Sequence, residues 1–72
     1  MKTTKLKIKK KARLSRGYIT LLKDSLEQIC IDANDNDFVN LEESIQYAKD
    51  TIQKLFDNIT EIEYMMYLLK HK

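Results

Sequence analysis

The stretch DANDNDFVNLEE carries the side chains of this chain that come closest to a metal site. Aligned as an EF-hand loop, its oxygen-bearing residues at positions 1, 3, 5 and 12 are Asp32, Asn34, Asn36 and Glu43. Position 6 holds Asp37, although the sharp turn of a calcium loop requires glycine there. We therefore expect a polar turn between two helices, and a calcium-binding hairpin is a remote alternative.

Catalytic chemistry has few candidates in the sequence. His71, the one histidine, lies near a helix end that we expect to fray. Cys30 has no histidine near it in the helical pattern, and we expect it to be a small buried apolar residue. The acidic residues scatter over solvent-facing positions, and the sequence has no glycine-rich phosphate loop. We predict a non-enzyme with no catalytic residue, no metal ligand, no cofactor and no small-molecule substrate.

Two segments with helical periodicity flank the polar stretch. Steps of three and four residues separate the apolar positions of the second segment, a heptad pattern that strands do not produce. These positions are Phe38, Leu41, Ile45, Ala48, Ile52, Leu55, Ile59, Ile62, Met66 and Leu69. The same spacing in the first segment joins Ile19, Leu22, Leu26, Ile29 and Ala33. The pattern predicts a first helix over about residues 15–33, a turn over 34–37 and a second helix over about 38–69.

A connection this short places two helices side by side as a hairpin. We therefore predict an all-α, antiparallel two-helix hairpin, coiled-coil-like, in which the ten apolar residues of the second helix face the first. On this prediction a charge at Ile52 is buried and unfolds the domain. A chain of 72 residues buries little surface by itself, so we expect a dimer or a partner chain to complete the fold.

Basic residues gather at the beginning of the chain. Residues 1–16 carry eight cations and no acid, whereas residues 17–72 carry five bases and eleven acids. We divide the chain into a basic arm or frayed helix extension, 1–16, and a hairpin, 17–72, because Gly17 and N-terminal cations both disfavour a helix. Deleting residues 1–13 should then leave the hairpin intact. The candidate phosphate-binding residues are Lys5, Lys7, Lys9, Lys10, Lys11, Arg13 and Arg16.

The end of the second helix carries more apolar residues than one facing helix can cover. A first helix that starts near residue 15 ends opposite about residue 57, so the stretch IEYMMYLL projects beyond it. In the alternative, the register continues backward through Ser15, Ala12 and Ile8, the helix begins near Thr4, and the basic segment covers this stretch. Surfaces rich in tyrosine and methionine are typical of protein interfaces. We therefore predict a homodimer or partner interface formed by Phe56, Tyr64, Met65, Tyr67 and Leu68.

An apolar first helix, a brief polar turn and a second helix that opens with an aromatic-x-x-apolar step follow one another here. The step is Phe38 to Leu41, followed by Ala48. Over about residues 18–69 the chain resembles the small helical-hairpin co-chaperones of bacterial type III secretion needle subunits. The resemblance implies a cytoplasmic protein that binds a tetratricopeptide-like chaperone and helps to keep the needle subunit unpolymerised.

The predicted function is thus that of a small protein-interaction module in the cytoplasm, such as a co-chaperone or adaptor. The alternative is a small nucleic-acid-binding regulator of the phage or plasmid type that uses the basic segment. The longest apolar run, YMMYLL, is far too short to span a membrane, so we expect no membrane span.

Overall fold

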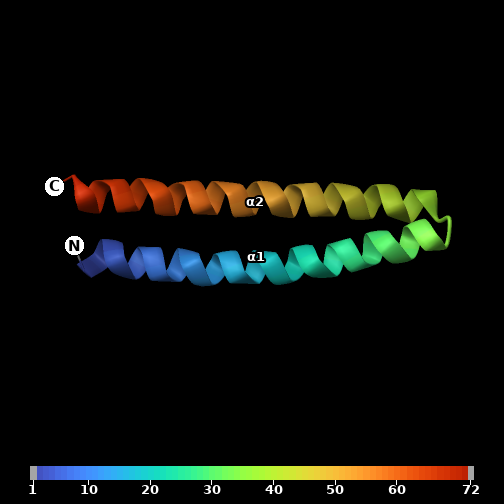
Figure 1. Cartoon of the computed structure of the whole chain (residues 1–72), viewed down its shortest axis with the longest axis horizontal. Helices are drawn as coiled ribbons and strands as arrows, with labels where there is room; N and C mark the ends of the chain where they lie inside the picture. The colour runs from blue at the N-terminus through green and yellow to red at the C-terminus, as the bar shows by residue number, and fades with distance from the viewer. Residues whose placement is uncertain (1, 72) are drawn as a thin grey trace.

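Two long antiparallel helices make up the molecule (Figure 1). A computed structural model of the chain describes residues 2–71 and contains α1, Lys2–Asn34, and α2, Phe38–Lys70. The hairpin is a rod 54 Å long and 15 by 12 Å across, with the turn at one end and both ends of the chain at the other. The all-α antiparallel hairpin is therefore confirmed. Residues 1 and 72, which the sequence assigns to the basic segment and the hairpin, lie outside the described residues.

The turn between the helices satisfies free backbone groups of both. Asn36 has a φ of 57°, in the left-handed region that asparagine tolerates better than most residues. Its N–H donates to the Ala33 carbonyl at 3.2 Å, and the N–H of Asp37 donates to the Asp32 carbonyl at 2.9 Å. This Schellman pattern ends α1. Asp37 then caps α2, because its Oδ1 accepts from the N–H of Asn40 at 3.3 Å.

The first helix is longer than the spacing of its apolar residues predicts. α1 begins at Lys2 rather than near Ser15, and it passes through Gly17 without interruption. Contacts with α2 explain the difference, because packing against a second helix offsets the cost of about 1 kcal/mol for a glycine and that of cations near the N-terminus. The described part of the basic segment, residues 2–16, therefore belongs to α1 as a continuous helix.

The C-terminal part of α2 accordingly does not project beyond α1, contrary to the prediction. Ile62, Met65 and Leu69 are half-buried, and the Nζ of Lys11 forms an ion pair with Glu61 across the two helices. Removing residues 1–13 would uncover these side chains. On this structure we therefore expect the deletion to disturb the hairpin, and the outcome stays a prediction.

The seam between the helices contains the least exposed positions of each, spaced by threes and fours. On α1 they are Thr4, Ile8, Lys11, Ser15, Tyr18, Leu22, Ser25, Ile29 and Asp32. On α2 they are Leu41, Ser44, Ala48, Thr51, Leu55, Asn58, Ile62, Met65 and Leu69. Of the hydrophobic residues whose burial is described, Ala48 alone is fully buried, whereas four polar ones are. The seam holds the helices together but is not a full hydrophobic core.

Only half of the apolar heptad predicted for α2 faces α1. The exposed half consists of Phe38, Ile45, Ile52, Ile59 and Met66. Ile19 and Leu26 of α1 are exposed too, by 55% and 51%. The prediction that all ten residues face α1 is wrong, because the apolar stripe of each helix is wider than one neighbouring helix covers. A charge at Ile52, which is 50% exposed, would not be buried in a single hairpin.

Candidate protein interface

The hairpin has one apolar and one polar broad face. With about 3.6 residues per helical turn, residues seven apart lie nearly above one another. On each helix the exposed apolar positions repeat at this interval. When each helix is viewed from its N-terminus, these positions are offset from the seam in the same direction around the helix axis. In two antiparallel helices, positions that are offset from the seam in the same direction lie on the same side of the hairpin. The exposed stripes of α1 and α2 therefore share one face of the rod.

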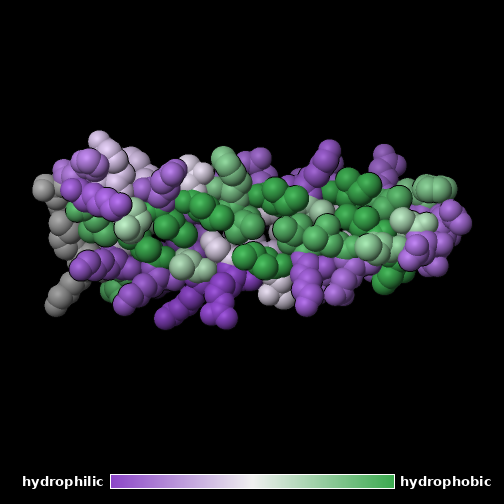
Figure 2. All heavy atoms as spheres, in the orientation of Figure 1, coloured by the Kyte–Doolittle hydropathy of each residue, from purple (hydrophilic) through white to green (hydrophobic). Residues whose placement is uncertain are grey.

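Figure 2 shows hydrophobic side chains gathered in a band along most of the rod, over both helices, with hydrophilic side chains at the edges. The band is accessible, since Phe38 is 66% exposed and Ile59 51%. Phe56, 64% exposed, flanks it, four residues after Ile52 and three before Ile59. We call the following residues the apolar face: Ala12, Ile19, Leu26, Ala33, Phe38, Ile45, Ile52, Phe56, Ile59 and Met66.

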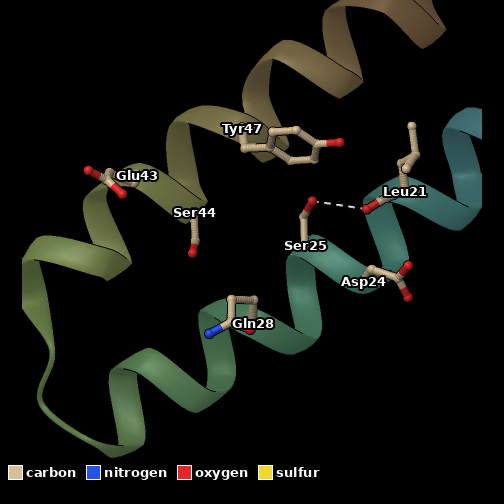
Figure 3. A pocket seen from close by; sticks show the side chains of 7 residues that line it. All are labelled: Leu21, Asp24, Ser25, Gln28, Glu43, Ser44 and Tyr47. Carbon is tan, nitrogen blue, oxygen red and sulfur yellow. Dashed lines mark hydrogen bonds between the residues drawn. The ribbon is translucent and has the colours of Figure 1, made fainter.

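The other side of the seam carries an open groove of about 490 Å³ (Figure 3). Its lining residues are Leu21, Asp24, Ser25, Gln28, Glu43, Ser44 and Tyr47. The Ser25 hydroxyl donates to the Leu21 carbonyl at 2.9 Å, and the Ser44 hydroxyl donates to Asp32 at 2.8 Å. None of the seven lining residues is a histidine, lysine or cysteine. The Ser44 hydroxyl thus links the two helices, whereas the Ser25 hydroxyl is bonded within α1.

The side chains of the calcium-loop-like stretch cap and cross-link the helices. The carboxylate of Asp32 is 4% exposed and accepts from Gln28 at 2.9 Å as well as from Ser44. Asp37 caps α2, and Asn34 is the last residue of α1. In the part of the chain that the structure describes, no three histidine, cysteine or acidic residues come together as metal ligands.

A second polar cross-link lies nearer the chain ends. The Nδ2 of Asn58, a residue that is 5% exposed, donates to the Lys11 carbonyl at 2.6 Å and to the Ser15 hydroxyl at 2.7 Å. A buried amide with both N–H groups satisfied fixes the register of one helix on the other. The sequence analysis missed this contact. Its signal is the polar repeat of Ser44, Thr51 and Asn58, seven residues apart.

The predicted partner-binding residues do not share one surface. Met65 lies in the seam, and Phe56 lies at the margin of the apolar face. Tyr64 and Tyr67 lie on sides of α2 away from the seam, where the Tyr67 ring stacks against the ring of His71 at 4.3 Å. Leu68 falls on the groove side. A single flat partner could contact only part of this set, and its role in binding stays a prediction.

Cys30 is exposed, contrary to the expectation of a buried residue. It lines a shallow apolar hollow on α1 together with Ile19, Leu22 and Leu26. Cys30 is exposed for the same reason that half of the α2 heptad is exposed. The first helix turns only part of its apolar stripe toward α2. Cys30 therefore lies beside the apolar face.

Charge is divided along the rod. The half at the chain ends, residues 2–16 and 57–71, has nine cations and three carboxylates, a net charge of +6. The half at the turn, residues 17–56, has three cations and eight carboxylates, a net charge of −5. Lys11 lies in the seam, and the exposed candidate phosphate ligands are Lys5, Lys7, Lys9, Lys10, Arg13 and Arg16. The basic half presents cations on several sides of α1.

The fold and its surfaces define the class of this molecule, which is an amphipathic antiparallel helical hairpin. Comparison of the chain with family models, with curated proteins and with solved structures found no match. Neither helix, over its described residues, holds a stretch apolar enough to cross a membrane.

Proposed function

We propose that this chain is a protein-interaction module whose apolar face is covered by helices of another polypeptide. The observation that carries the proposal is the exposed heptad stripe on both helices, beside a seam in which Ala48 is the one fully buried hydrophobic residue described. Burial of apolar surface contributes about 25 cal/mol per Å², so covering this band stabilises a small hairpin by several kcal/mol. Stripes at heptad spacing fit a helical partner.

In this proposal the module is non-catalytic, needs no cofactor and works in the cytoplasm as an adaptor or co-chaperone. A co-chaperone of type III secretion is the specific role suggested by the resemblance. The step that carries the resemblance suits it, because Phe38 lies on the apolar face and Leu41 in the seam. Phe38 would then be available to a tetratricopeptide-like chaperone while Leu41 holds the hairpin.

Photo-cross-linking in the host cell tests the proposal directly. A photoreactive amino acid at Ile52, on the apolar face, should form adducts with a protein chain. The same amino acid at Val39, which is 71% exposed but lies away from the apolar face, should form few or none. Gel mobility and mass of the adducts measure the difference. Equal yields at the two positions, or no adduct at Ile52, would remove the support for an interaction module.

The basic half of the rod favours nucleic-acid binding as a second candidate function. Its exposed cations could contact phosphates, and the affinity for a DNA duplex should then fall with salt by a log–log slope of about 0.9 per contact. Replacing Lys9, Lys10 and Arg13 with glutamine should lower that slope in a gel-retardation titration.

The matched control removes three cations from the acidic half, through Lys23→Gln, Lys49→Gln and Lys54→Gln. This control should bind with the slope of the unaltered chain. Equal weakening by the two triple variants would show that net charge alone acts. If the unaltered chain retards neither DNA nor RNA at low salt, this second function is excluded.

A further inference from the structure

We infer that a second copy of the same hairpin covers the apolar face, head to tail, and that the two copies form an antiparallel four-helix bundle. The inference rests on the proposed function and names its partner. Three observations carry it: the direction of the apolar stripes, the size of the apolar face and the division of charge along the rod.

The apolar stripes point in the direction that a four-helix bundle requires. In a two-stranded coiled coil the heptad residues face the one neighbouring helix, whereas each helix of a four-helix bundle packs against two neighbours around a shared core. Leu41, Ala48 and Leu55 supply the first contact, in the seam. Ile45 and Ile52, in the same heptad, lie on the apolar face. The stripe is therefore centred between the two directions, toward the axis of a bundle.

The size of the apolar face suits a stable dimer. The rod measures 54 by 15 Å between Cα positions across this face, so a second hairpin laid along it covers roughly 800 Å² on each copy. That is about the area per partner in a specific protein interface of standard size. A short peptide or a single turn of helix would leave most of the band exposed.

Charge decides between the two symmetric arrangements of such a dimer. A two-fold axis along the rod places both turns at one end, so that the two basic halves lie together, +6 beside +6. A two-fold axis across the rod, within the plane of the face, places the basic half of each copy on the acidic half of the other, +6 against −5. Complementary charge steers association and fixes register, and like charges oppose it. The head-to-tail arrangement is favoured.

Side-chain sizes agree with the head-to-tail arrangement. It brings together residues that lie equally far on either side of the middle of each helix. Ile19, near the middle of α1, then lies beside its own copy, and Ala12 lies opposite Leu26 of the second copy. In α2, whose middle is residue 54, Ile52 then lies opposite Phe56 of the second copy. The small Ala12 thus meets the large Leu26 in α1, and Ile52 and Phe56 fill the centre of α2.

Sedimentation of three purified proteins tests the dimer. The unaltered chain should sediment at twice its mass of 8.6 kDa. Ile52→Lys with Ile59→Lys should raise the dimer dissociation constant by 100-fold or more, on the order of 3 kcal/mol, because four cations enter the shared core. The matched control, Ile31→Lys with Val39→Lys, also changes two exposed β-branched residues, but off the apolar face. It should remain a dimer.

A spin-label distance tests the arrangement without altering the apolar face. In Cys30→Ser with Asp35→Cys, each copy carries one label at the turn. The head-to-tail dimer separates the two labels by nearly the full rod length of 54 Å. A dimer with both turns at one end would bring them within about half that distance, since neighbouring helices lie about 10 Å apart.

The outcomes distinguish the inference from the proposed function. A monomeric unaltered chain overturns the inference. If Ile52 nevertheless forms adducts with a different protein in cells, the proposed function survives alone. A dimer that persists unchanged in the Ile52 and Ile59 double variant places its interface elsewhere and overturns the inference, and the proposed function is lost as well only if Ile52 forms no adduct. A short label distance overturns the head-to-tail arrangement, and it does so even if the double variant fails to fold.

Discussion

Replacing Leu55 with aspartate is expected to unfold the hairpin at room temperature. Leu55 is half-buried in the seam, where truncating a leucine costs about 2–5 kcal/mol and a carboxylate adds a desolvation penalty. A domain of this size has a total stability of only about 3–5 kcal/mol from its core. Circular dichroism at 222 nm should therefore show most of the helical signal lost in Leu55→Asp.

The neighbouring exposed position supplies the control for this experiment. Lys54→Asp should keep its helical signal and change the free energy of unfolding by about 0.5 kcal/mol or less. The helical signal of Ile52→Asp should differ from those of Leu55→Asp and Lys54→Asp, because Ile52 lies on the apolar face and not in the seam. A melting temperature of Leu55→Asp equal to that of the unaltered chain would show that the seam has been assigned to the wrong residues.

Deletion of residues 2–13 is expected to unfold more of the chain than it removes. It takes away the helical turns beside Ile62, Met65 and Leu69 and the acceptor carbonyl of Asn58 at Lys11. Apolar side chains left without a neighbour do not hold a helix end, since isolated helical turns are unstable in water. The loss of ellipticity should correspond to about 24 helical residues rather than to the 12 deleted, because about one residue of α2 loses its neighbour for each residue of α1 removed.

A full-length variant with fewer cations separates lost packing from lost charge. Replacing Lys5, Lys9, Lys10 and Arg13 with glutamine removes four of the same cations but leaves the helix beside α2. This variant should keep the full helical signal. If the deletion lowers the ellipticity only by the residues removed, the basic part of α1 contributes no support to α2.

The two helices and their turn could be read from local patterns. The three-four spacing from Phe38 to Leu69 predicts α2 to within a residue at its C-terminal end, and Asp37 is a strong capping residue. For the beginning of α1 the pattern left two alternatives, near Ser15 and near Thr4. Gly17 and the crowded cations weaken a helix locally, while the compensating contact with α2 is tertiary.

Only part of the candidate interface could be predicted from the sequence. Heptad spacing shows where the middle of an apolar stripe lies but not how much of the stripe a neighbour covers. Ile52 and Leu55 belong to one heptad, yet the first is on the apolar face and the second in the seam. The interface predicted around Tyr64 depended on the prediction that the first helix begins near residue 15. Once α1 reaches Lys2, the exposed surface lies along the whole rod.

Gly17 has a consequence for how the hairpin opens. It stands near the middle of α1, at the border between the basic and acidic halves, and a methyl group added there would meet nothing within 4 Å. The backbone of α1 is weakest at this point, since glycine costs about 1 kcal/mol relative to alanine in a helix. We therefore expect local unfolding to divide the molecule into two cooperative units, each with its own polar contact between the helices: Asn58 with Ser15 in one and Ser44 with Asp32 in the other. The unit at the turn can stay folded while the basic unit unfolds. A deletion of residues 2–13 that leaves the turn half helical would be a permanent version of that partly open state.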